Sequence, residues 1–375
     1  MVNRKMIERL VAPAVVMALV LGAPGCSTAL GPADPTDIGS WMELYEVPGV
    51  SVAVIKDFGL DYVEVHGVKS KSTREPVTDQ TLFQAASLSK SVSAAGVVSL
   101  AQDGTVSLDA DVNNYLTSWQ VPDNGFQDTE KVTLRRLLSH TAGTTVSGFR
   151  GYRYPEAVPT LIQILNGEPP ANSAPIVVNS VPGSGFRYSG GGYLIAQQAV
   201  MDVTGTTFPE FIRERVLEPI GLNNSTFEQP LPDSLLDSAA SGYYANGVAV
   251  PGSHHIYPEI AAGGWWTTPT DVAHFLIELQ LSLRGELNSV LSKENAELLV
   301  TEVRNDYALG LALRSDRGQP YFWHAGANDG FRCAMIAHLS KGYGLVIMTN
   351  SDNGEPELSE AVIKLIGRRE GWPGY

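Results

Sequence analysis

The sequence contains few cysteines and few basic residues. Only Cys26 and Cys333 occur in 375 residues, so no intrachain disulfide can form in a mature chain whose Cys26 is lipidated or cleaved off. Such a chain must be stabilised by its hydrophobic core, and the apolar run around Cys333 predicts a buried strand residue and not a nucleophile. Lysine and arginine number 26 against 40 acidic residues, a formal net charge of −14. This balance argues against nucleic-acid binding and against electrostatic docking on an anionic membrane.

The apolar run near the N-terminus, residues 11–21, is too short for a permanent membrane helix. It follows basic residues and fits the core of a signal peptide. The four residues that end at Cys26 resemble a lipoprotein processing site, at which Cys26 would be lipidated; the alternative is an ordinary cleavage site with an incidental cysteine. We expect residues 1–26 to be a signal peptide and residues 27–40 a tether. The protein is then exported to the bacterial cell envelope, in the periplasm or as a membrane-anchored lipoprotein.

Strand and helix patterns occupy different parts of the chain. Strand character marks Val50–Ile55, Tyr62–His66, Tyr307–Leu313, Gly330–His338 and Gly344–Thr349. Helical spacing dominates between these groups, and an amphipathic helix over Glu357–Ile366 closes the chain. We therefore expect an α/β fold of the α+β type: an antiparallel sheet from both chain ends (41–86 and 285–375), flanked by helices, with a mainly helical inserted subdomain (87–284) and the active site between them.

Ser87 and Lys90 form an S-x-x-K pair at a predicted helix start. Residues three apart share a helix face, and the positive end of the helix favours an alkoxide-like attacking oxygen. Lys90 can accept the proton of Ser87 only if burial and neighbouring cations lower its pKa. The motif alone decides little, because chance produces about one match in a chain of this length.

Two further elements follow in order. Tyr188 lies in a Gly-rich turn before a helix, where catalytic side chains are often displayed, although it could equally pack its ring. His324, followed by Gly326, precedes a strand-like run, and the glycine lets a substrate lie close along the strand edge. A surface histidine at a turn is the alternative interpretation.

Several other catalytic patterns are missing. No G-x-S-x-G elbow occurs, which excludes the α/β-hydrolase route. The pair His254-His255 with Glu259 lacks H-E-x-x-H spacing, so we interpret it as a polar loop and expect no metal. The three glycines after Ser189 have no P-loop lysine and do not form a phosphate cradle. We expect no cofactor.

The order S-x-x-K, Tyr in a Gly-rich loop, then [HK]-x-G resembles that of class C β-lactamases, related D-alanyl-D-alanine peptidases and β-lactamase-like (family VIII) esterases. Further landmarks resemble the same family over roughly residues 48–352: LAQDG (100–104), LLSHTAG (137–143), PIGL (219–222) and GG (263–264) leading into TPTD (268–271).

The resemblance implies a β-lactamase/transpeptidase-like fold and a role for each matching residue. Ser87 would form an acyl-enzyme, while Lys90 and Tyr188 would share general-base duty. The N–H groups of Ser87 and Ala327 would form the oxyanion hole, and His324 would touch Tyr188 or an acidic substrate group.

Two departures from the family pattern narrow the range of substrates that we expect. Gly190 replaces the asparagine that usually binds an acylamide side chain, and His324 replaces the lysine of efficient class C enzymes. We expect a serine hydrolase for esters, D-amino-acid peptides or amides, and β-lactams slowly. The alternatives are a class C-like β-lactamase or D-Ala-D-Ala carboxypeptidase, and a slowly deacylating penicillin-binding sensor or scaffold. The partner is a small-molecule or peptide substrate, with no nucleic acid and no membrane contact beyond a lipid anchor. A protonated His324 holding an anionic substrate would raise KM between about pH 6 and 8.

Overall fold

The computed structural model describes residues 35–375. The expected signal peptide 1–26, with the lipidation at Cys26, and most of the tether 27–40 lie outside the described residues. The first element, α1 (Ile38–Leu44), already starts within the last residues of the expected tether. Within the described range, no helix is both long and apolar enough to cross a membrane.

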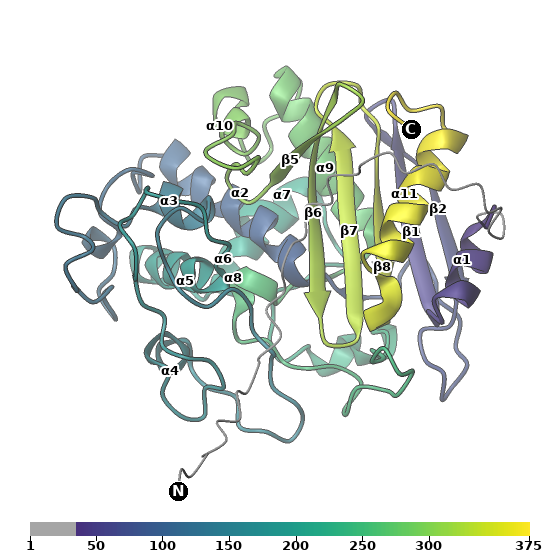
Figure 1. The fold of residues 1–375 in the computed structure, drawn as a ribbon, viewed down its shortest axis with the longest axis horizontal. Helices are drawn as coiled ribbons and strands as arrows, with labels where there is room; N and C mark the ends of the chain where they lie inside the picture. Colours follow the sequence, from purple (N-terminus) through teal and green to yellow (C-terminus); the bar gives the residue numbers. More distant parts are fainter. Residues whose placement is uncertain (1–34) are drawn as a thin grey trace, which may run out of the picture. The chain divides into compact units, whose positions relative to one another are not determined.

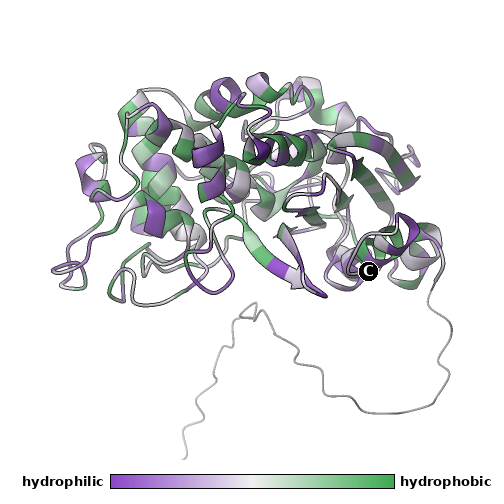
Figure 2. Ribbon diagram, turned by 90° about the horizontal axis from the view of Figure 1, so that it is seen from above, coloured by the Kyte–Doolittle hydropathy of each residue, from purple (hydrophilic) through white to green (hydrophobic). Residues whose placement is uncertain are grey.

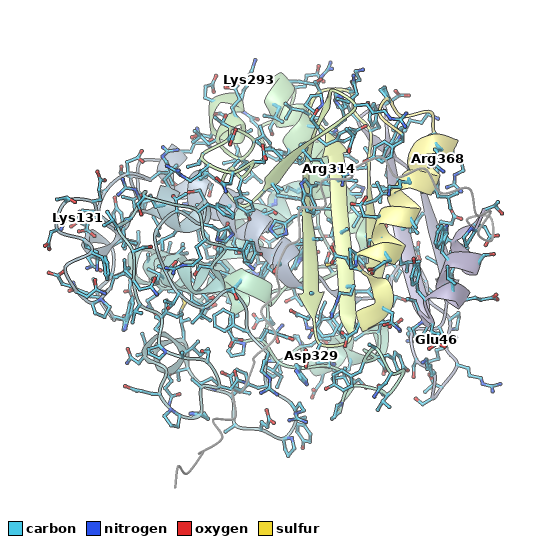
Figure 3. The ribbon with its side chains drawn as sticks, viewed as in Figure 1. Glu46, Lys131, Lys293, Arg314, Asp329 and Arg368 are labelled. Atoms are coloured by element: carbon cyan, nitrogen blue, oxygen red, sulfur yellow. The ribbon has the colours of Figure 1, made fainter. Side chains whose placement is uncertain are left out.

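Six antiparallel strands form the main sheet, in the order β2-β1-β8-β7-β6-β5 (Figure 1). Two come from the start of the described chain and four from its end, so the prediction of a sheet built from both chain ends is confirmed. The strands are β1 (Gly49–Lys56), β2 (Gly59–Gly67), β5 (Ala312–Asp316), β6 (Gln319–Asn328), β7 (Phe331–His338) and β8 (Gly344–Thr349). Asp329 marks the turn between β6 and β7, and Arg314 lies on β5 (Figure 3).

Helices fill the segment between the two groups of strands. They are α2 (Ser89–Gln102), α3 (Leu134–Leu138), α4 (Leu161–Asn166), α5 (Gly190–Thr204), α6 (Phe208–Ile212), α7 (Glu218–Ile220), α8 (Ile260–Gly263) and α9 (Pro269–Arg284). After them come α10 (Lys293–Leu298) and the C-terminal α11 (Glu357–Arg369). A two-stranded sheet pairs β3 (Phe83–Gln84) with β4 (Trp266–Thr267) and so joins the chain before α2 to the chain after α8.

Alternate residues of β1 face opposite layers of the molecule. Val50, Val52 and Val54 belong to the core under α1 and α11, whereas Ala53 and Ile55 belong to the larger core on the other side. Figure 1 shows α11 in front of the sheet and α9 behind it. The strands are largely hydrophobic along their length (Figure 2), as expected for a sheet covered on both faces.

Helix α9 lies within residues 87–284, which we expected to form the helical subdomain. It instead contacts β1, β2 and β8 and covers one face of the sheet. Its buried stripe includes Val272, Leu276 and Leu279, which belong to the same core as the inner face of the sheet. The change from helical part to sheet layer therefore comes before α9, about 15 residues earlier than the expected boundary.

Two strand expectations near the C-terminal end are wrong. Tyr307–Leu313 was expected to be a strand, but β5 begins only at Ala312. Gly310 has φ +78° and lies so close to α2 that a Cβ there would be 2.8 Å from the Lys90 carbonyl oxygen. This close passage breaks the strand pattern. The second error is an omission: β6 (Gln319–Asn328) carries His324 but was not among the predicted strands, and a turn at His324 was the alternative interpretation.

Candidate active site

Ser87 lies in a short 3-10 turn (Ala86–Leu88) that leads directly into α2. The preceding backbone is fixed, because the Ala85 N–H donates to the Trp265 carbonyl at 2.8 Å. Ala86 itself has φ +46°, a left-handed conformation that costs about 1–3 kcal/mol in a non-glycine residue. The Ser89 hydroxyl compensates by donating to the Ala86 carbonyl at 2.6 Å. The nucleophile candidate is therefore presented by a strained and tightly held turn.

Lys90 is directed at Ser87 from the first turn of α2. Its Nζ lies 2.9 Å from the Ser87 hydroxyl oxygen and donates to the Ala262 carbonyl at 2.6 Å. The residue is only 2% exposed, and burial lowers the pKa of its ammonium from 10.5 to about 7. Burial alone lowers the pKa of Lys90, and the neighbouring cations that the sequence analysis invoked are not needed to explain the shift. A substantial fraction of Lys90 is thus an uncharged amine at neutral pH.

Tyr188 reaches the same place from the loop before α5. Its ring packs on His140 with 4.2 Å between ring centroids, and Lys90 Nζ lies 5.2 Å from its ring centre. The His140 Nδ1 accepts a hydrogen bond of 3.1 Å from the Ser189 N–H, which fixes the turn that holds Tyr188. Burial raises the pKa of the Tyr188 phenol, and a hydrogen bond with Ser87 opposes that rise only partly. Tyr188 consequently stays protonated at neutral pH.

His324 is buried in β6 and contacts a tyrosine that the sequence analysis did not select. Its Nε2 lies 3.0 Å from the Tyr307 hydroxyl, and its Nδ1 lies 2.7 Å from the Ala325 carbonyl. The carbonyl requires Nδ1 to be the protonated nitrogen, so Nε2 accepts from Tyr307. Burial, aided by the charge of Lys90, lowers the pKa of His324 to about 3. In this structure His324 is therefore neutral near pH 7, which argues against the expectation that a protonated His324 holds an anionic substrate.

Gly326 and Ala327 lie on an edge of β6 that carries no neighbouring strand. β5 pairs with β6 only as far as Trp323, so the edge beyond that residue is open on the side away from β7. A Cβ on Gly326 would lie 3.0 Å from the Ser87 nitrogen and 2.6 Å from the Ala85 carbonyl oxygen. The open edge therefore runs beside the nucleophile candidate, and only glycine leaves room for that approach.

We expect Gly326→Ala to lower kcat/KM at least about 100-fold, because the added methyl group would push Ser87 away from β6 and a displacement near 1 Å costs about that factor. Steady-state kinetics on a nitrophenyl ester measure the loss. Gly318→Ala is a matched control, since a Cβ there meets nothing within 4 Å although its φ is +80°. Near-normal activity of Gly326→Ala would contradict the close approach.

Cys333 supports this edge from β7. Its side chain is fully buried and its Sγ lies 3.0 Å from the Ala85 carbonyl oxygen. Burial raises the pKa of the thiol well above its usual value, so the prediction of a buried strand residue and not a nucleophile is confirmed.

The structure brings together Ser87, Lys90, Tyr188, His324 and Gly326, with Ala327 next on the same strand edge. Sequence reasoning missed two contributors. No motif marked Tyr307 as a site residue, because in the sequence it is one aromatic residue in an apolar run. The second is the backbone carbonyl of Ala262, which no side-chain pattern could indicate.

Comparison with known proteins agrees with this arrangement. The family model described as Beta-lactamase matches residues 38–366. The protein flp of Staphylococcus aureus (strain N315) is 23% identical over 336 residues, which cover 85% of this chain but only 62% of that relative. Penicillin-binding protein 4 of Amycolatopsis lactamdurans is 25% identical over 361 residues, covering 90% of this chain and 91% of the relative.

A solved structure shows the same fold. The penicillin-binding protein homologue from Pyrococcus abyssi superposes with a TM-score of 0.70 at 23% identity, covering 89% of this chain and 76% of that one. The family match extends over most of the chain and includes every residue of the site. The chain therefore belongs to the β-lactamase family, within the superfamily of serine hydrolases and penicillin-binding proteins.

Proposed function

We propose that the protein hydrolyses acyl substrates through an acyl-enzyme on Ser87. The observation that carries this proposal is the 2.9 Å contact between Lys90 Nζ and the Ser87 hydroxyl, made by an amine whose pKa is about 7. Uncharged Lys90 accepts the Ser87 proton while the serine oxygen attacks the substrate carbonyl carbon. The negative oxygen that develops accepts hydrogen bonds from the N–H groups of Ser87 and Ala327.

Tyr188 and Lys90 have different protonation states, so in this mechanism Tyr188 acts first as an acid and Lys90 as the base. Protonated Tyr188 donates its proton to the leaving oxygen or nitrogen and is reprotonated from Lys90, which gained the serine proton. Water then attacks the acyl carbon, gives a proton to the same pair, and releases the acid and free Ser87. The raised pKa of Tyr188 supports the role of acid in the first half and argues against a phenolate base, because the phenol stays protonated at neutral pH.

The substrates we propose are esters and D-amino-acid peptides or amides, with β-lactams turned over slowly. The space beside Gly190 supports this preference. A Cβ at residue 190 would lie 2.9 Å from Cε2 of the Phe149 ring and 3.3 Å from the Ser147 carbonyl oxygen. The ring of Phe149 thus occupies the space where the family places a hydrogen-bonding asparagine, so an apolar wall replaces an amide-binding group.

Restoring the asparagine should shift the substrate preference. We expect Gly190→Asn combined with Phe149→Ala to raise the ratio of cephalosporin to ester turnover about 5- to 10-fold, the worth of one hydrogen bond. Gly190→Asn alone should destabilise the fold by about 1–3 kcal/mol, because its side chain meets Phe149. The ratio of kcat/KM values on a chromogenic cephalosporin and a nitrophenyl butyrate measures the shift. Phe149→Ala alone is the control, and an unchanged ratio in the double variant would contradict the proposed wall.

A panel of substrates tests the proposed function and its alternatives. The purified protein is offered a short-chain nitrophenyl ester, a chromogenic cephalosporin and a D-Ala-D-Ala peptide. Fast ester turnover supports the hydrolase, whereas dominant cephalosporin or peptide turnover favours the class C-like β-lactamase or the carboxypeptidase. A stable adduct on Ser87 without turnover of any substrate favours the penicillin-binding sensor.

We further propose that the protein works in the bacterial cell envelope, after export and lipidation at Cys26. The proposal rests on the basic and apolar opening of the sequence and on the residues that end at Cys26. Mass spectrometry of the mature N-terminus from a bacterial host distinguishes a diacylated cysteine from a simple cleavage product.

A further inference from the structure

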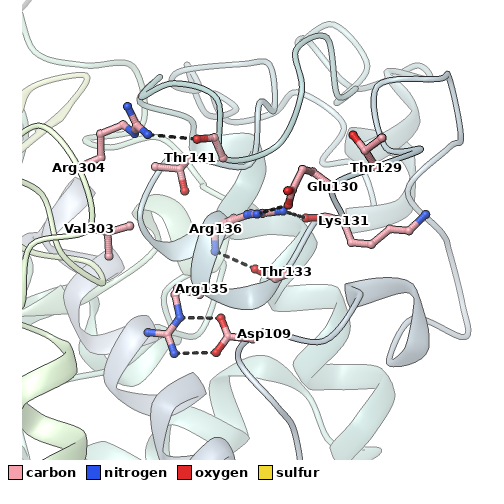
Figure 4. A pocket seen from close by; sticks show the side chains of 11 residues that line it. Asp109, Thr129, Glu130, Lys131, Thr133, Arg135, Arg136, Thr141, Val303 and Arg304 are labelled. Atoms are coloured by element: carbon pink, nitrogen blue, oxygen red, sulfur yellow. Dashed lines mark hydrogen bonds and ion pairs between the residues drawn. The ribbon is translucent and has the colours of Figure 1, made fainter.

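A cationic pocket of about 450 Å³ lies in the helical part of the molecule (Figure 4), and none of its lining residues is one of the catalytic groups. Its lining residues are 109, 129–131, 133, 135–136, 141, 183 and 303–304. Four lining side chains are cationic (Lys131, Arg135, Arg136 and Arg304), and two are carboxylates (Asp109 and Glu130). The pocket is therefore net positive in a chain whose formal net charge is −14.

Two guanidinium groups converge on Gly183. Arg304 donates to the Gly183 carbonyl at 3.3 Å, and a Cβ on Gly183 would lie 3.1–3.2 Å from the guanidinium of Arg136. The close-up shows Thr141 beside these two arginines, while the ammonium of Lys131 points away from them (Figure 4). Lys131 also lies at the margin of the helical part (Figure 3). The two guanidinium groups thus reach the same wall of the pocket, where Arg136 also donates to the Lys131 carbonyl at 2.6 Å.

The carboxylates neutralise only part of this charge. Asp109 pairs with Arg135 through two hydrogen bonds of 2.7 and 2.8 Å, and Glu130 pairs with Arg136. Arg304 has no carboxylate partner among the residues that the structure describes. Two arginines near one residue repel each other, and an anion between them would relieve that repulsion.

The pocket shares its walls with the segments that hold the catalytic site. Thr141 follows His140, which packs on Tyr188. The N–H groups of Val303 and Arg304 both donate to the Tyr307 carbonyl, at 2.9 and 3.3 Å. The pocket is thus connected through its walls to segments of the catalytic site, and its volume of about 450 Å³ is within the 300–1,000 Å³ usual for small-molecule sites.

We propose that this pocket binds an oxyanion, a phosphate or carboxylate group, between Arg136 and Arg304, with the Thr141 hydroxyl beside it. Guanidinium forks match both groups because each offers paired oxygens to paired N–H donors. The site is separate from Ser87, so its ligand is a second molecule or a distal group and not the acyl group undergoing hydrolysis. This inference does not rest on the proposed hydrolase activity.

Calorimetric titration of the Ser87→Ala protein with inorganic phosphate and, separately, citrate tests the proposal. Using this variant keeps turnover out of the measurement. We expect saturable binding of at least one anion at constant ionic strength, and the anion that binds more tightly identifies the preferred group. Arg304→Ala should weaken binding at least about 10-fold. Glu130→Gln should strengthen it about 3- to 5-fold, because it removes the carboxylate that competes for Arg136.

Charge-matched controls separate a local site from a general effect of net charge. Arg213→Ala and Glu214→Gln make the same charge changes at an exposed ion pair elsewhere, and both should leave the affinity within twofold of the parent. Arg304 is exposed and makes one hydrogen bond, so its removal should not unfold the protein. The proposal is overturned if neither anion binds saturably, or if Arg304→Ala and Glu130→Gln bind as the controls do.

Discussion

Ser87→Ala is expected to lower kcat by about 10⁴-fold or more on every substrate that the wild-type protein turns over. The acyl-enzyme cannot form without the serine oxygen, and removal of a covalent nucleophile elsewhere costs factors of this size. Tyr188, Lys90 and the strand edge at Ala327 would remain and supply only the weak residual catalysis of an oxyanion site. Steady-state kinetics measure the loss, and mass spectrometry of the intact protein measures the acyl adduct, which should vanish.

A serine outside the site serves as the control for this variant. Ser184 is exposed and its hydroxyl donates only to the Val181 carbonyl, so Ser184→Ala should keep nearly full activity. Because Ser87 is hydrogen-bonded to Lys90 but contributes little to the core, Ser87→Ala should also keep a wild-type circular dichroism spectrum. Turnover that survives in a folded Ser87→Ala protein would refute the mechanism.

Regular patterns made much of the fold predictable. The β-branched run at Val50–Ile55 and the apolar run that ends at Thr349 both became strands because alternating residues face two cores. β6 escaped prediction, since Pro320 and Gly326 are unfavourable in a strand and their reasons are tertiary. Gly326 is required by the nearby Ser87 turn, which the local sequence does not reveal.

The site shows the same division between local and tertiary information. Ser87, Lys90 and Tyr188 were found through the order of motifs, and the structure brings their side chains together. The charge state of His324 could not be predicted, because it depends on burial and on the distance to Lys90 rather than on the residues next to it in the sequence. Phe149 was equally hidden, since its contact with the space beside Gly190 joins two loops about 40 residues apart.

Lys90→Met is expected to reduce kcat about as severely as Ser87→Ala does, because residues that act as one catalytic unit are strongly non-additive. Methionine fills a similar volume but cannot accept the Ser87 proton. The double variant Ser87→Ala/Lys90→Met should therefore be scarcely less active than either single variant. Single-turnover rates of substrate hydrolysis measured for all three proteins provide the comparison.

The pH profile links this loss to Lys90. Only the uncharged amine is a base, so wild-type kcat/KM should rise with pH through about 7 and then level off. His140 and His324 cannot produce this rise, because burial holds the pKa of both imidazoles well below 6.5. Glu259 precedes α8 and has a pKa raised by burial to about 8, so it would titrate later. The rise near pH 7 should be absent from Lys90→Met.

The Lys90→Met substitution should change stability and activity in opposite directions. The pKa of Lys90 is lower in the folded state than in the unfolded chain, so between about pH 7 and 10 the unfolded chain binds more protons and the unfolding free energy of the wild type rises with pH. Below pH 7 Lys90 is charged in the folded state, and burial of its ammonium lowers the unfolding free energy by the full desolvation cost. Lys90→Met removes that penalty and should be more stable than the wild type by about 3 kcal/mol at pH 6, with the gain shrinking as pH rises.

Urea unfolding at pH 6 and pH 9 measures both stability differences, and Lys341→Met is the matched control. Lys341 is exposed and its ammonium contacts only Gln319, so its replacement should change neither the pH profile nor the stability difference between the two pH values. If Lys90→Met is inactive but no more stable than the wild type at pH 6, then burial of the Lys90 ammonium does not destabilise the folded protein. A Lys90→Met protein that keeps the rise near pH 7 would assign the base to another group.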